Sequence, residues 1–171
     1  MLFRSNLMGT LNLLKACTEK NVNKFVFASS SSVYGNNKKV PFSEDDNVDF
    51  PISPYAATKK SGELLCHTYS NLYDISVACL RFFTVYGPRQ RPDLAIYKFT
   101  KLIIEDTEIP FYGDGTNERD YTYIDDIVEG INKTIKWIDT ENKQFDVFNL
   151  GGDHTISLKE MVETIESVLN K

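Results

Sequence analysis

Residues 24–35 of the chain read KFVFASSSSVYG, a short apolar run that leads into four consecutive serines. An apolar run of this length predicts a strand buried on both faces, as strands of parallel sheets are. Helical and strand patterns alternate on both sides of it along the 171 residues. This alternation predicts an α/β fold with a mostly parallel sheet.

The spacing of apolar residues predicts the other elements of the fold. Helices are expected over residues 2–20, 53–72, 95–105 and 124–138, with a last helix that Ser157 caps. Strands are expected over residues 75–83, 109–112, 121–123 and 145–150, with a turn at residues 113–115.

The composition excludes several classes of protein. With 42% hydrophobic residues, 25% charged residues and a net charge of −5, the chain has no basic excess to offset phosphates, so we expect no nucleic-acid binding. Cys17, Cys66 and Cys79 lack zinc-ligand spacing and are typical of buried free thiols in a reducing compartment. No apolar run is long enough to span a bilayer and no signal peptide is present, so a cytoplasmic protein that does not enter membranes is expected.

No metal site is expected either. The acidic run at residues 44–46 predicts a solvated loop. His67 and His154 have no nucleophile or metal ligand at a suggestive spacing, so both are interpreted as structural.

The segment SPYAATKKSGE at residues 53–63 contains a candidate catalytic pair. On a helix, Tyr55 and Lys59 lie four residues apart and share a face. An ammonium beside a phenol favours the ionised phenol, which would make Tyr55 a usable base at neutral pH. Taken alone, the pair also fits an ordinary surface helix.

The surroundings of this pair favour an active site. The serines at residues 29–32 follow the strand at the carboxyl edge of the sheet, where ligands bind in open α/β folds. A hydroxyl there can hydrogen-bond the oxygen that Tyr55 deprotonates, although serines are also common in turns. A second strand follows the helix and leads into RFFTVYGP at residues 81–88.

Together these motifs resemble the extended short-chain dehydrogenase/reductase family, specifically its nucleotide-sugar 4-epimerases, over essentially the whole chain. The resemblance implies the C-terminal part of a doubly wound, Rossmann-type sheet with NAD as cofactor of the intact enzyme. It assigns residues 1–94 to the catalytic half of the NAD-binding domain. Residues 95–171 become elements of a substrate-binding subdomain, interleaved with the last strand of that sheet.

The resemblance also assigns roles to single residues. The catalytic positions, which also contact the cofactor, are Ser30, Tyr55 and Lys59. Further cofactor contacts are implied for Ser5, Ser29 and Phe83. Substrate contacts are implied for Ser31, Ser32, Thr84, Arg91, Tyr112 and Arg119. Arg119 would clamp a diphosphate by charge-assisted hydrogen bonds, although it also fits a surface arginine.

Two serines restrict the type of reaction that the resemblance implies. In the related dehydratases and decarboxylases, acidic residues occupy one or both of the two positions after the catalytic serine or threonine. Ser31 and Ser32 occupy these positions here, and neither can serve as a carboxylate acid or base. The resemblance therefore favours epimerisation at C4 of a UDP-sugar through a 4-keto intermediate.

Arg91 suggests the sugar. It lies in GPRQRPD, at residues 87–93, which resembles a signature of UDP-glucuronate 4-epimerases, and a guanidinium pairs well with a uronate carboxylate. UDP-glucuronate and UDP-galacturonate are therefore the expected substrate and product. Arg91 fits a phosphate contact or a purely structural loop contact equally well, and UDP-glucose or UDP-N-acetylglucosamine is the alternative substrate.

One motif of the family is missing. No strand is followed by the Gly-rich turn with which a Rossmann domain approaches a pyrophosphate. By the resemblance, the chain is a fragment without the N-terminal Gly-rich unit and the C-terminal end, and the fragment alone is expected to be inactive. The alternative interpretation is a non-catalytic remnant or interaction module. Because helices 2–20 and 53–72 pair with a second subunit in the family, a homodimer is expected.

Overall fold

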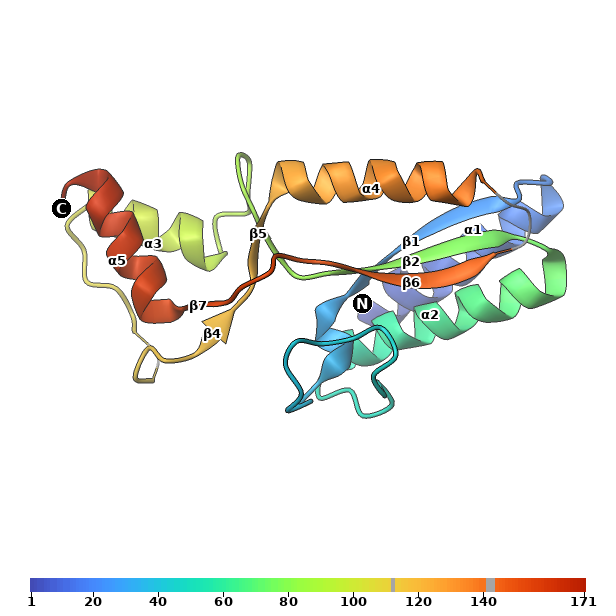
Figure 1. Ribbon diagram of the computed structural model, residues 1–171, viewed down its shortest axis with the longest axis horizontal. Helices are drawn as coiled ribbons and strands as arrows, with labels where there is room; N and C mark the ends of the chain where they lie inside the picture. The colour runs from blue at the N-terminus through green and yellow to red at the C-terminus, as the bar shows by residue number, and fades with distance from the viewer. Residues whose placement is uncertain (112, 141–143) are drawn as a thin grey trace. The chain divides into compact units, whose positions relative to one another are not determined.

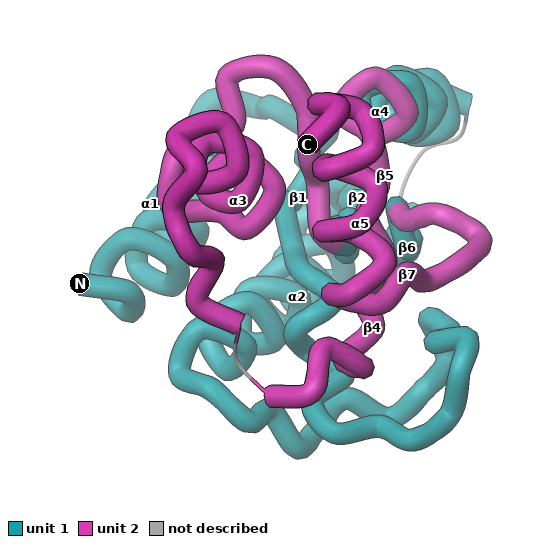
Figure 2. Tube along the Cα trace, turned by 90° about the vertical axis from the view of Figure 1, so that its left-hand side faces the viewer, with its two compact units in different colours: residues 1–83, 128–150 teal, residues 84–127, 151–171 magenta. Residues whose placement is uncertain are grey.

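The computed structural model describes residues 1–111, 113–140 and 144–171. They form two compact units, which Figure 2 colours separately. Unit 1 comprises residues 1–83 and 128–150, and unit 2 comprises residues 84–127 and 151–171. The chain therefore passes from unit 1 to unit 2 at Phe83 and returns through the helix that begins at Ile124.

A three-stranded parallel sheet forms the centre of unit 1. Its strands are β1 (Lys24–Ser30), β2 (Ser76–Phe82) and β6 (Phe145–Leu150), in the order β1-β2-β6. The register aligns the three carboxyl ends, since Ser30 pairs with Phe82 and Phe82 with Leu150. The predicted parallel α/β fold is thus confirmed.

Helices cover both faces of this sheet, as in a doubly wound fold (Figure 1). On one face lie the π-helix η1 (Phe3–Met8), α1 (Gly9–Glu19) and α2 (Pro54–Tyr73). The other face is covered by α4 (Ile124–Ile138), where the Trp137 ring packs edge-on against Phe148 at 4.9 Å. On α1, Leu14 is fully buried in the core of unit 1, and Cys17 packs against the same core.

Unit 2 combines two small two-stranded sheets with a helix pair. Strand β3 (Thr84–Tyr86) runs parallel to β5 (Tyr121–Tyr123), and β4 (Glu118–Arg119) pairs antiparallel with β7 (Ile156–Ser157). Helix α3 (Ala95–Ile104) packs on α5 (Leu158–Leu169) through buried Phe99, Met161 and Val162. The Ser157 hydroxyl accepts a hydrogen bond from the Glu160 backbone N–H, which confirms the predicted cap.

The strand expected over residues 109–112 is wrong for the described residues 109–111, which have no regular structure. Pro110 has no N–H to donate to a sheet ladder, and the apolar Ile109 packs instead against the α3–α5 core. Tyr112 lies outside the described residues. An apolar residue in this segment therefore fills a helix interface rather than a sheet.

Two further findings concern the cysteines and membranes. Cys17, Cys66 and Cys79 are free thiols, and the last two are buried in the core of unit 1, as their patterns predict. Across residues 1–111, 113–140 and 144–171, the structure has no helix with the length and apolar character required to cross a membrane.

Candidate active site

The serine run forms the transition from β1 to a short 3-10 helix, η2 (Ser31–Tyr34). Ser30 is the N-cap of η2, with extended backbone angles of −159° and 145°. Its Oγ accepts hydrogen bonds from the Ser32 backbone N at 3.2 Å and from Ser32 Oγ at 2.9 Å. Ser30, Ser31 and Ser32 remain partly exposed at the carboxyl edge of the sheet, where a ligand can reach them.

Tyr55 and Lys59 lie in the first two turns of α2, which begins where the sequence predicts. Ser53 caps the helix by accepting a hydrogen bond from Ala56 N at 3.1 Å, and Pro54 occupies the first turn. Tyr55 is 40% exposed, and Lys59 Nζ lies 5.6 Å from the centre of its ring. The expected proximity of ammonium and phenol is therefore present.

Lys59 also ties α2 to the end of β1. Its Nζ donates a hydrogen bond to the Ala28 carbonyl oxygen at 2.7 Å and lies 5.5 Å from the centre of the Phe27 ring. Burial lowers the pKa of Lys59 from its usual value. The sheet edge that carries Ser30 and the helix that carries Tyr55 are thus joined by a partly buried ammonium.

A second contact to this part of α2 comes from the N-terminal helix. Asn6 Nδ2 donates to Thr58 Oγ1 at 3.1 Å, and Thr58 Oγ1 donates to the Tyr55 carbonyl oxygen at 2.8 Å. Thr58 is fully buried. Sequence reasoning did not predict this contact, which joins residues 52 positions apart. Ser5, in the same π-helix, is exposed.

The sequence also gave no role to Glu63 and Arg81, which form a buried ion pair beside the serines. Arg81 Nε and Nη2 each lie 3.0 Å from a different carboxylate oxygen of Glu63, and Ser29 Oγ donates to Glu63 Oε1 at 2.5 Å. Because the Ser29 hydroxyl donates to Glu63, a cofactor contact by Ser29 would have to use the hydroxyl oxygen as an acceptor or the backbone. The available signal was Arg81 itself, since a charge inside a buried apolar strand requires a partner.

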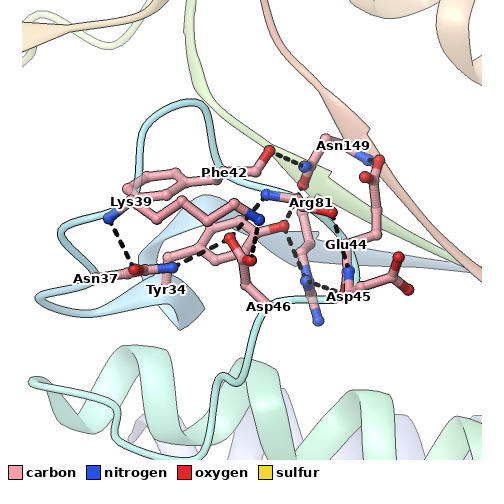
Figure 3. Close-up of polar contacts among 10 residues, drawn as sticks. Tyr34, Asn37, Lys39, Phe42, Glu44, Asp45, Asp46, Arg81 and Asn149 are labelled. Carbon is pink, nitrogen blue, oxygen red and sulfur yellow. Dashed lines mark hydrogen bonds and ion pairs between the residues drawn. The ribbon is translucent and has the colours of Figure 1, made fainter.

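In the loop between η2 and α2, Glu44 and Asp45 are exposed, as predicted, whereas Asp46 is bonded within the loop (Figure 3). The Asp46 side chain is only 10% exposed and accepts hydrogen bonds from Lys39 Nζ at 2.6 Å and Ser43 N at 2.9 Å. These contacts lower the pKa of Asp46, with the Lys39 hydrogen bond as the largest cause. Glu44, although exposed, accepts a hydrogen bond from Asn149 N at 2.8 Å.

The histidines and the acidic groups provide no metal site within the described residues. Across residues 1–111, 113–140 and 144–171, no cluster of three or more His, Cys, Asp or Glu side chains could hold a metal ion. His154 is exposed and pairs with Asp153 at 2.6 Å, which raises the pKa of the histidine. His67 packs edge-on against Phe145.

The remaining site candidates divide between the two units. Phe83, at the end of unit 1, packs near Phe42, and its backbone N donates to the Leu150 carbonyl oxygen at 3.1 Å. In unit 2, Thr84 begins β3 and Arg119 is exposed in β4. Arg91 is 73% exposed and forms an ion pair with Asp93 at 3.0 Å. Tyr112 is the one candidate outside the described residues.

Comparisons with known proteins identify the family of the chain. A sequence profile of the NAD dependent epimerase/dehydratase family matches residues 1–151. The UDP-glucuronate 4-epimerase of Thermodesulfobacterium geofontis is 46% identical over 168 residues, which cover 98% of this chain and 50% of that protein. The chain therefore spans about half the length of the curated relatives it matches.

Solved structures show the same fold. UDP-glucuronic acid 4-epimerase from Bacillus cereus, in complex with UDP-glucuronic acid and NAD, is 42% identical with a TM-score of 0.89, covering 97% of this chain and 52% of that one. UDP-N-acetylglucosamine 4-epimerase from Methanobrevibacter ruminantium is 32% identical with a TM-score of 0.89, covering 99% of this chain and 54% of that one. The resemblance inferred from the serine and Tyr55 motifs is confirmed, and the chain belongs to the NAD dependent epimerase/dehydratase family.

Proposed function

We propose that the protein of which these residues form the active site is an NAD-dependent 4-epimerase that interconverts UDP-glucuronate and UDP-galacturonate. The observation that carries this proposal is the placement of Tyr55 and Lys59 on α2, with Lys59 hydrogen-bonded to the end of the strand that bears Ser30. The similarity to UDP-glucuronate 4-epimerases supports the choice of reaction.

In the proposed reaction, Tyr55 takes the proton from the sugar 4-hydroxyl and later returns it to the 4-keto oxygen. Tyr55 is 40% exposed, as a base that a substrate must reach has to be. The Ser30 hydroxyl orients the same oxygen from the sheet edge. No carboxylate follows Ser30 in η2. The 4-keto sugar can therefore rotate in the site and present its other face, without an acid–base pair that would eliminate water.

The residues at this edge fit a nicotinamide cofactor. An ammonium has three N–H donors, and Lys59 gives one to Ala28, which leaves donors for a ribose diol at the same place. Lys59 and Tyr55 would hold that ribose, with Ser5, Ser29 and Phe83 as further contacts. When bound, NAD supplies a reversible acceptor for the C4 hydride.

Further residues are proposed to contact the substrate. Arg119 is exposed, and its guanidinium would pair with the diphosphate. Thr84 and Tyr112 are the proposed contacts to the sugar and the nucleotide part, and Ser31 and Ser32 are further proposed substrate contacts.

Arg91 is the proposed selector of the uronate. Its pair with Asp93 lies in solvent and stabilises little, so the guanidinium is available for a carboxylate. In the full-length protein, Arg91→Met is expected to lower kcat/KM for UDP-glucuronate by about 10- to 100-fold, the range of a hydrogen bond to a charged group. Turnover of UDP-glucose, which has no carboxylate, should change little.

The matched control is Arg89→Met, which removes an exposed arginine two residues away in the same loop. It should leave both substrates unaffected. Product formation is measured by separating the two UDP-sugars of each pair by chromatography. An equal loss for both substrates in Arg91→Met would assign this arginine to the phosphates or the loop and contradict a role in uronate selection.

We also propose that α1 and α2 form the contact with a second subunit. The two helices pack together, yet Leu13 on α1 and Leu64 on α2 remain exposed. Leu13→Glu combined with Leu64→Glu should convert a dimer to a monomer in sedimentation equilibrium, because charges are costly in an apolar interface. Val168→Glu, at an even more exposed apolar position on α5, is the control that should stay dimeric. A wild-type monomer would refute this proposal.

A further inference from the structure

Three consecutive residues of β1 contact three positions of α2. Gly62 packs so tightly on Phe27 that a Cβ at residue 62 would lie 2.3 Å from Phe27 Cζ. The Ala28 carbonyl oxygen accepts the bond from Lys59, and the Ser29 hydroxyl donates to Glu63. The helix and the strand can therefore meet in one axial register only, since a shift by one residue would break all three contacts.

Glu63 is the contact closest to the serine edge, and Arg81 fixes its orientation. The side chains of Arg81 and Glu63 are only 3% and 4% exposed, and their two parallel hydrogen bonds hold the carboxylate in the plane of the guanidinium. Burial lowers the pKa of Arg81, but its bonds to Glu63 and Tyr34 outweigh this, so the pKa rises and the charge persists. Ser29 and Arg81 are paired in the register of β1 and β2, which places all three groups together.

Arg81 also reaches the third strand and the loop (Figure 3). Its Nη1 donates to Tyr34 Oη at 2.9 Å, and Tyr34 Oη donates to Asn149 Oδ1 at 2.7 Å. Nη1 also lies 3.4 Å from the Glu44 carbonyl oxygen. The guanidinium thus joins α2, η2 and the loop before α2 at the edge where Ser30 lies, and through Tyr34 it is linked to β6.

A buried ion pair of this kind stabilises a protein little more than apolar residues of the same volume would. The pair instead fixes the relative position and orientation of the two side chains, because a bidentate guanidinium–carboxylate contact permits only a narrow range of geometries. We propose that Glu63 and Arg81 are positioning residues of the active site. They hold Tyr55 and Lys59 of α2 at a fixed separation from Ser30. This inference rests on the proposed function for its kinetic consequence.

The first test is Glu63→Gln in the full-length protein. Glutamine has the same size and can still accept the Ser29 hydrogen bond, but it loses one of the two charged bonds to Arg81. The expected result is a kcat lowered about 10- to 100-fold with KM for the UDP-sugar changed less than about threefold, because small misplacements of catalytic groups are costly. Glu63→Asp keeps the charge but shortens the side chain, and should lower kcat in the same way.

Val77→Ala is the matched control, because Val77 is fully buried in β2, four residues before Arg81, and belongs to the apolar core of unit 1. It should lower the melting temperature as Glu63→Gln does and leave kcat unchanged. If kcat of Glu63→Gln and Glu63→Asp stays within about twofold of wild type while the melting temperature falls, the pair is only structural and the proposal is overturned.

A readout without turnover separates this inference from the proposed function. In protein labelled with ¹³C at the tyrosine Cζ carbons, the NMR signal of Tyr55 is assigned from its loss in Tyr55→Phe. It should shift in Glu63→Gln and remain in place in Val77→Ala. An unchanged signal in Glu63→Gln overturns the positioning role. If the wild-type protein turns over no UDP-sugar but the Tyr55 signal still shifts in Glu63→Gln, the proposed reaction is refuted and the positioning role is kept.

Discussion

Tyr55→Phe in the full-length protein is expected to lower kcat for epimerisation of UDP-glucuronate by about 10²- to 10⁴-fold, the contribution typical of a positioned acid or base. The change removes one oxygen and leaves the ring, which is 40% exposed and contacts the Lys59 ammonium. The backbone at residue 55, which accepts the Thr58 hydrogen bond, is unaffected. Binding of the UDP-sugar should therefore change little, and NAD should lose only the contact that the Tyr55 hydroxyl is proposed to make with its ribose.

The measurement combines the rate of product formation with titration calorimetry of NAD. Tyr73→Phe is the control, since Tyr73 is an exposed tyrosine at the other end of α2 and its ring packs on Tyr69. That variant should retain the wild-type rate. Turnover of Tyr55→Phe near the wild-type rate would remove the base assigned to this reaction.

The long elements could be predicted from the sequence because their signals are local. The helix over residues 124–138 and the strand over residues 145–150 have the predicted bounds, since each carries a complete apolar period. The two-residue strands β4 and β7 could not be predicted. Arg119 pairs with Ile156 across 37 positions, and nothing in two residues of sequence indicates the partner.

The same distinction applies to the site. Ser30, Tyr55 and Lys59 lie within 30 residues and carry their chemistry in recognisable motifs. The groups that hold them in place are distant in sequence, as in the Asn6–Thr58 bond and in the Tyr34–Asn149 bond, which spans 115 positions. Such contacts follow from tertiary packing, which a single sequence does not state. The sequence motifs therefore predict the reacting groups, whereas only the structure shows the contacts that position them.

The largest effect on stability is expected from Arg81→Met. Methionine fills much of the arginine volume, but Glu63 then remains buried with its charge unpaired. Removing one partner of a buried ion pair costs about 3–5 kcal/mol of the free energy of unfolding. Tyr34 would lose the Arg81 hydrogen bond as well, although its bond to Asn149 remains. Urea unfolding followed by circular dichroism measures the loss.

The double variant Arg81→Met with Glu63→Leu tests the cause of that loss. If the unpaired carboxylate is responsible, replacing it by an apolar side chain should restore most of the stability, because the desolvation cost disappears with the charge. Lys133→Met, which breaks an exposed ion pair with Glu129, is the control and should change stability little. A double variant as unstable as Arg81→Met would mean that packing rather than charge dominates. A stable double variant that epimerises slowly would instead separate the role of the pair in stability from its role in positioning. Its core would fold without the ion pair, but Tyr55 and Lys59 would no longer be held in register with Ser30.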